Sequence, residues 1–174
     1  MSYYSIGSYF KDVGITIVAS LGMGLMLALA ADLVMVKKAS AASERELIEQ
    51  ASEENVGIPV LWARGYTNGC EEGLMGFYDT RRKRVVMCEA GLDDYAEMID
   101  TLRHEVWHAV QYNCNGGQTV LSDEQIRNGL KRSDVRVMRN HYKQHKHRLE
   151  GEARTVAQMP TPNFLQGLER YCAF

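Results

Sequence analysis

The feature that most constrains this chain of 174 residues is the pattern His104-Glu105-Val106-Trp107-His108. Residues four apart on an α-helix lie one turn above each other, so the two imidazoles can reach one metal ion without distorting the backbone. Glu105 follows the first histidine and can take a proton from a water bound to that metal. The spacing therefore predicts a helix that carries two metal ligands and a general base.

The residues around this pattern predict an amphipathic helix with a metal cleft on one side. At about 100° per residue the apolar side chains form one broad face, and both histidines fall roughly opposite it with Trp107 and Gln111. The apolar face comprises Tyr95, Met98, Ile99, Leu102, Val106, Ala109 and Val110. We expect the helix to begin after the acidic pair 93–94 and to end near Cys114, before Asn-Gly-Gly at 115–117. The alternative is a surface helix with two solvated histidines.

A β-prone region precedes this helix. Residues 58–62, 74–78 and 84–88 have the composition of strands. Pro59 favours an edge position for the first run, because proline has no N–H to donate to a neighbouring strand. The sequence Asp-Thr-Arg-Arg-Lys at 79–83 predicts a hairpin with a basic tip between the other two runs. We interpret the tip as a solvated turn; a patch for a substrate or partner is the alternative.

A catalytic zinc site usually has three protein ligands and a water, so the two histidines need a third partner. One kind of zinc peptidase places a histidine six residues after the second, but here that position holds Cys114, which we interpret as structural. Residues 149–157 offer a carboxylate on a helix whose small alanines allow close packing against the metal-bearing helix. Glu150 and Glu152 are the two candidates for this ligand; both could instead be exposed acids at a helix start.

The basic run 140–148 contains three more histidines and a tyrosine. Its lysine and arginine side chains would repel a cation, so we expect His141, His145 and His147 on a solvated helix surface. Tyr142 is a candidate to donate a hydrogen bond to the oxyanion that develops during amide hydrolysis. A tyrosine in the core is the alternative interpretation.

These motifs resemble a minimal zincin of the gluzincin type, in which HEVWH is followed by a downstream EGEA. They are also similar to small zincin-like proteins of phage and cyanobacterial origin that place Leu-x-His-Glu-x-x-His after a short sheet. The resemblance covers roughly residues 58–160. It implies an α+β fold, in which a small antiparallel or mixed sheet is followed by the HExxH helix and further helices.

The same resemblance implies a zinc-dependent peptidase. Zn²⁺ would be held by His104, His108 and Glu150, and Glu105 would be the general base for cleavage of a peptide or protein substrate. An amide in a cell-wall peptide is equally compatible with the motif. The chain departs from the pattern at Arg154, where some Glu-x-x-Ala families carry an aspartate that orients a ligand.

The N-terminal part of the chain contains an apolar segment, residues 13–36, with Asp32 as its only charge. This segment is long enough to span a bilayer as a helix. Lys37 and Lys38 follow it, and the positive-inside rule would then place the rest of the chain in the cytoplasm. We therefore expect a membrane-anchored chain.

Two alternatives to an anchor stay open. Small residues at 28–30 and 39–41 resemble cleavage sites of a signal sequence, which would make the domain exported. The apolar helix could also be buried in a larger assembly, such as a virion. We expect residues 1–38 to form the anchor, assembly helix or signal sequence, 39–57 a linker with a short helix, and 58–174 the zincin-like domain.

Composition limits the partners and the compartment. A net charge of −2 and a pI of about 6.2 give no basis for a nucleic-acid partner. The four cysteines, Cys70, Cys88, Cys114 and Cys172, fit two disulfides in an exported domain, with three pairings, or free thiols in a reducing compartment. A bond between Cys70 and Cys88 would staple the predicted hairpin region.

The apolar segment also supports a hypothesis from another class. The chain could be a structural component of a membrane complex or virus particle that retains a zincin fold. A third hypothesis is a zinc-dependent regulator or toxin that cleaves a single partner. The complete His-Glu-x-x-His pattern favours an active enzyme over a purely structural protein.

Overall fold

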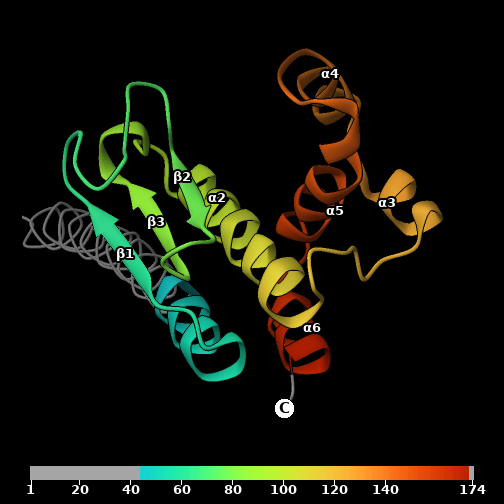
Figure 1. Cartoon of the computed structure of the whole chain (residues 1–174), viewed down its shortest axis with the longest axis horizontal. Coiled ribbons are helices and arrows are strands. Elements are labelled where there is room, and N and C mark those ends of the chain that lie inside the picture. Colours follow the sequence, from blue (N-terminus) through green and yellow to red (C-terminus); the bar gives the residue numbers. More distant parts are fainter. Residues whose placement is uncertain (1–43, 173–174) are drawn as a thin grey trace, which may run out of the picture. The chain divides into compact units, whose positions relative to one another are not determined.

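The computed structural model describes residues 44–172 (Figure 1). The expected apolar helix, with its anchor, assembly and signal-sequence interpretations, lies outside the described residues. Within residues 44–172, no helix is both long enough and apolar enough to cross a membrane.

The sheet has three strands in the order β1-β3-β2: β1 (Val60–Ala63), β2 (Gly76–Asp79) and β3 (Arg84–Cys88). β1 is parallel to β3, and β2 is antiparallel to it. β3 is central because its Val-Val-Met-Cys run is buried on both faces, whereas an edge strand needs fewer apolar side chains. The predicted α+β class with a small mixed sheet is confirmed, as is the edge position of the first strand.

The helices follow from local capping signals. The Asp94 side chain accepts a hydrogen bond from the Glu97 amide at 3.0 Å, which caps the helix of the His-Glu-x-x-His pattern. Ser122 and Gln125 form a reciprocal capping box at the start of α3. A helical segment at 44–51 leads directly into η1. The helical elements that follow this segment are η1 (Ser52–Val56), η2 (Glu89–Gly91), α2 (Tyr95–Ala109), η3 (Val110–Cys114), α3 (Asp123–Gly129), α4 (Arg132–His141), η4 (Gln144–Lys146), α5 (His147–Ala157) and α6 (Thr161–Cys172).

Helix α2 packs against the sheet on one side and against α5 on another (Figure 1). Leu102 and Val106 are fully buried, as the apolar face predicts. The expectation that Trp107 shares the open side of α2 with the histidines is wrong. Trp107 is buried against Phe164 and Tyr171 of α6, a helix that a wheel of α2 alone cannot reveal.

Close packing against α3 fixes the position of α5. A Cβ atom at Gly129 would lie 2.1 Å from Thr155 Cγ2, so only glycine permits this approach. The Thr155 hydroxyl donates a hydrogen bond to the Ile126 carbonyl at 3.2 Å. Most of the circumference of α5, including both Glu150 and Glu152, is buried.

Two disulfides link distant parts of this core. Cys70, in the loop before β2, bonds to Cys88 at the end of β3. Cys114, at the end of η3, bonds to Cys172 at the end of α6. The second bond ties the C-terminal helix to the element that continues directly from α2.

Candidate metal centre

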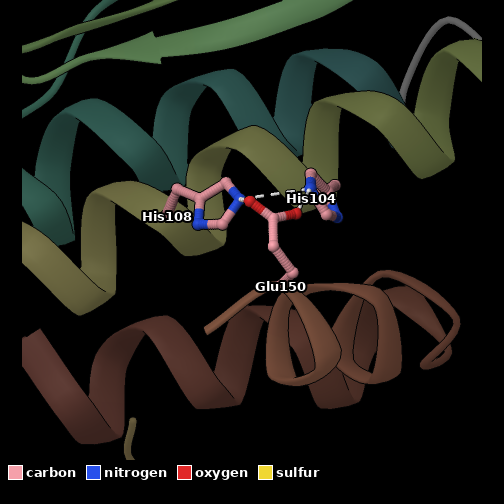
Figure 2. A group of neighbouring side chains, drawn as sticks. All are labelled: His104, His108 and Glu150. Atoms are coloured by element: carbon pink, nitrogen blue, oxygen red, sulfur yellow. Dashed lines mark hydrogen bonds and ion pairs between the residues drawn. The ribbon is translucent and has the colours of Figure 1, made fainter. Parts of the chain in front are cut away.

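Helices α2 and α5 bring His104, His108 and Glu150 together (Figure 2). The two histidines lie one turn apart on α2, and the carboxylate projects between them from α5. One ligand atom from each of the three side chains lies within 4.8 Å of the other two. Among the side chains that the structure describes in residues 44–172, no other group of histidine, cysteine or acidic residues gathers in this way.

The separations between the ligand atoms suit tetrahedral coordination. Two ligands about 2.0–2.1 Å from a zinc ion in tetrahedral geometry are about 3.3 Å apart. The distance from His104 Nε2 to His108 Nε2 is 3.1 Å. Glu150 lies 3.4 Å from His104 Nε2 through Oε2 and 3.5 Å from His108 Nε2 through Oε1. The two histidine nitrogens lie close to the tetrahedral value, and each has a different oxygen of the Glu150 carboxylate at a similar distance, so the three side chains converge on one position where an ion can bind.

The described residues leave this cluster incompletely satisfied. Among them, buried Glu150 Oε2 finds no hydrogen-bond partner, although it lies 3.4 Å from His104 Nε2. A buried carboxylate oxygen without a partner is costly unless a cation or a proton donor compensates it. Two imidazole nitrogens and one carboxylate oxygen are also ligand types that zinc prefers. The residues present therefore fit a zinc ion.

The charges of the cluster are strongly coupled. Burial by itself would lower the pKa of His108, but hydrogen bonding to Glu150 and the negative charge of Glu105 together raise it above its usual value. Burial would likewise raise the pKa of Glu150, but the two histidines hold it far below the usual range. Without metal, the cluster therefore favours a protonated imidazole beside an ionised carboxylate.

A second layer of side chains orients His108. Its Nδ1 atom lies 2.8 Å from Gln111 Oε1, which leaves Nε2 free to face the ion. The Gln111 amide nitrogen donates to Glu152 Oε2 at 2.6 Å and to the Leu149 carbonyl at 3.0 Å. Gln111 thus supplies an orienting contact for the His108 ring.

Glu152, the alternative third ligand, does not join the metal cluster. It is fully buried, and its other oxygen accepts hydrogen bonds from the amides of Val120 and Leu121. Glu152 therefore anchors the loop before α3 and supports Gln111. A glutamate two residues after Glu150 points away from the site because successive helical residues lie about 100° apart.

The cluster opens into a cavity of about 490 Å³ between β2, α2 and α5. Glu105 lines it and is 9% exposed, which places its carboxylate beside the ligands with access to a substrate. Tyr142 lines the same cavity from the end of α4. Burial and the nearby Glu150 carboxylate raise the pKa of Tyr142, so its hydroxyl stays protonated and can donate a hydrogen bond.

The other predicted residues lie outside the cluster. His145 is exposed in η4, as expected for a solvated surface. His147 is partly buried, and its Nε2 atom lies 2.8 Å from the Tyr142 carbonyl, so it helps to position the tyrosine. His141 is the last residue of α4. Cys114, considered as a ligand, is in a disulfide instead.

Sequence reasoning missed the roles of Gln111 and Glu152. A glutamine three residues after His108 lies on the same helical face, so its spacing carried a usable signal. The role of Glu152 depends on the loop at 120–121, whose position no local pattern reveals.

Comparisons of the chain with protein-family models, with curated proteins and with solved structures found no match. Its function is therefore inferred from the residues and the geometry of this site.

Proposed function

We propose that the chain is a zincin-type, zinc-dependent hydrolase that cleaves peptide bonds. The observation that carries this proposal is the convergence of His104, His108 and Glu150, whose ligand atoms lie within 4.8 Å of one another, on a cavity that Glu105 also lines. Three protein ligands with an accessible fourth position are typical of catalytic zinc sites, whereas structural sites are closed by four.

His104, His108 and Glu150 would hold the ion. When bound, Zn²⁺ would lower the pKa of a water ligand to about 7 and polarise the scissile carbonyl. Glu105 would take a proton from the attacking water and pass it to the leaving amine. Tyr142 would donate a hydrogen bond to the oxygen of the carbonyl as negative charge develops on it.

The sheet supports a peptide as the substrate. In the described sheet, β2 pairs only with β3, so its other edge has free backbone donors and acceptors. Residues of β2, among them Gly76 and Tyr78, line the cavity that contains the metal ligands. An extended peptide can add to such an edge through main-chain hydrogen bonds, which would position its carbonyl groups beside the site.

The membrane, export and virion hypotheses depend on residues 13–36, outside the described residues, and stay predictions. The hypothesis of a structural component rests on the same segment. The chemistry proposed for residues 104–150 applies wherever the domain is located.

Replacing Glu105 by glutamine tests the proposed chemistry. Glu105→Gln should retain zinc at the level of the unmodified protein, because Glu105 is not a ligand, and should lose at least about a thousandfold in peptide hydrolysis. Glu72→Gln, on the exposed loop before β2, is the matched control and should leave both quantities unchanged. Equal hydrolysis by Glu105→Gln and the unmodified protein would overturn the proposed mechanism.

A further inference from the structure

A second hollow, of about 720 Å³, adjoins the metal cavity at the far end of β2. Phe77, Tyr78 and Thr80 line both spaces, so the two hollows adjoin each other along this strand. A chain that follows β2 away from the metal ligands therefore enters the second hollow.

The lining of this hollow is positively charged. Arg81, Arg82 and Arg84 contribute three guanidinium groups, and Asp79 contributes the only carboxylate in the lining. Within residues 44–172, the structure contains no ion pair of Arg81. Arg84 Nε is buried without a hydrogen-bond partner and lies 3.8 Å from Asp79 Oδ2. Positive charge is therefore in excess.

The single carboxylate of Asp79 cannot neutralise all three guanidinium groups. Its carboxylate accepts hydrogen bonds from the backbone amides of Arg81 and Arg82, both at 3.1 Å, and pairs with the Arg82 guanidinium at 3.2 Å. The pKa of Asp79 lies below its usual range, and the hydrogen bond from the Arg82 amide is the largest cause. Asp79 is thus a structural part of the turn, and its contacts with the backbone shape the hollow independently of the arginine side chains.

We propose that this hollow, lined by Arg81, Arg82 and Arg84 and called the arginine subsite below, binds an aspartate or glutamate side chain of the peptide substrate. The inference rests on the proposed peptidase function and adds a substrate class to it. Guanidinium groups bind carboxylates through paired, charge-assisted hydrogen bonds, which suits an acidic side chain better than a neutral one. The acidic residue lies some residues away from the scissile bond, since β2 rises about 3.4 Å per residue.

The basic tip of the hairpin therefore has a role beyond that of a solvated turn. An isolated cluster of exposed arginines would have no reason to adjoin a catalytic cavity. Here the turn borders a hollow that shares lining residues with the metal cavity, and Arg81 has no ion pair within residues 44–172. An acidic substrate side chain would supply the negative charge that the lining lacks.

Three matched sets of synthetic octapeptides test this subsite. In each set one position holds a fixed residue, and the other positions are randomised in the same way in all sets. The fixed residue is glutamate in one set, glutamine in another and lysine in the third, and it is moved through every position. Cleavage by the zinc-loaded protein is followed by mass spectrometry. We expect glutamate at one side of the cut to raise kcat/KM about tenfold over glutamine, and this preference should weaken at high salt because exposed charges are screened.

Charge reversal identifies the residues responsible. In the variant Arg81→Glu/Arg82→Glu, the preference should invert toward lysine, while the zinc content stays that of the unmodified protein. Arg127→Glu/Arg136→Glu changes the net charge equally at exposed positions outside both hollows and should keep the preference for glutamate. Circular dichroism verifies that both variants are folded.

The outcomes separate the subsite from the chemistry. Equal cleavage of all three peptide sets, or an unchanged preference in Arg81→Glu/Arg82→Glu, would overturn the subsite and leave the peptidase intact. If no set is cleaved, the peptidase proposal fails, and binding of the uncleaved glutamate and glutamine peptides then tests the subsite. Fluorescence anisotropy that shows equal affinity for the two would overturn the subsite as well.

Discussion

His108 Nδ1 lies 2.8 Å from Gln111 Oε1. A glutamine about one turn further along the chain therefore fixes the ring through the nitrogen that does not face the metal position. Gln111 is fully buried and is itself held by Glu152. The orientation of a ligand on α2 therefore depends on a carboxylate of α5 that does not touch the metal position. This arrangement couples the packing of the two helices to the geometry of the site.

Removing the amide of Gln111 should weaken metal binding without removing a ligand. In Gln111→Ala, His108 loses the contact that fixes its ring, and loss of such outer contacts typically costs 10–100-fold in metal affinity. Competition for zinc with a chromogenic chelator measures the change. Gln118→Ala, at an exposed position in the loop after η3, should bind zinc as the unmodified protein does. Equal affinity of the two variants would contradict the orienting role.

Glu152 should contribute to stability more than any exposed glutamate. Glu152→Ala leaves the Val120 and Leu121 amides and the Gln111 side chain without their acceptor, in a site that water does not reach. We expect a loss of about 3 kcal/mol in the free energy of unfolding, since each buried unsatisfied group costs about 1–3 kcal/mol. Urea denaturation measures it, with the exposed Glu72→Ala as control. If Glu152→Ala loses no more free energy of unfolding than Glu72→Ala, other contacts hold the loop.

The metal-free and zinc-loaded proteins should respond to pH in opposite directions. The raised pKa of His108 adds stability below its unfolded value of about 6.5, and this stability is lost as the pH rises through the folded value. The lowered pKa of Glu150 adds stability above its usual value, and this is lost only in acid. Zinc binding instead requires a neutral imidazole, so zinc affinity increases as the pH rises.

Differential scanning fluorimetry tests this between about pH 6 and about pH 9. As the pH rises, the melting temperature measured with chelator should fall further below the melting temperature measured with zinc. In His108→Ala this divergence should be lost, because the titrating ligand is absent. Parallel curves for the unmodified protein would contradict the assignment of His108 to the metal site.

The two disulfides should differ in their contribution to stability. Cys114–Cys172 closes a sequence separation of 58 residues and Cys70–Cys88 one of 18. Loop entropy then gives about 4 kcal/mol for the first and about 3 kcal/mol for the second. Urea denaturation of Cys114→Ser/Cys172→Ser and Cys70→Ser/Cys88→Ser measures both. A larger loss in the Cys70→Ser/Cys88→Ser variant would contradict the entropic ranking.

Local patterns predicted much of the fold that surrounds the site. Runs with the composition of strands and a basic turn located the strands, and the acidic helix start and Asn-Gly-Gly stop located the ends of α2 and η3. The ligand spacing on α2 follows from helical periodicity alone. The small residues of 149–157 predicted that α5 lies close to α2, and the resemblance of Glu150 and Ala153 to a Glu-x-x-Ala element predicted Glu150 as the ligand.

The remaining features depend on contacts between distant segments. The environment of Trp107 is set by α6, which begins more than fifty residues later, so the periodicity of α2 could not distinguish a cleft from a second core face. The Glu-x-x-Ala resemblance ranked Glu150 above Glu152, but helical periodicity could not, because their roles depend on which side of α5 faces the loop at 120–121. The proximity of the metal cavity to the arginine subsite likewise appears only in three dimensions.

The most direct test of the metal centre is the zinc content of the purified protein, measured by inductively coupled plasma mass spectrometry after dialysis against trace zinc. The unmodified protein should hold one zinc per chain. Glu150→Ala and His108→Ala should each lose most of it, whereas Glu105→Gln should retain it. Full occupancy in Glu150→Ala, or no zinc in the unmodified protein, would contradict a centre built from His104, His108 and Glu150.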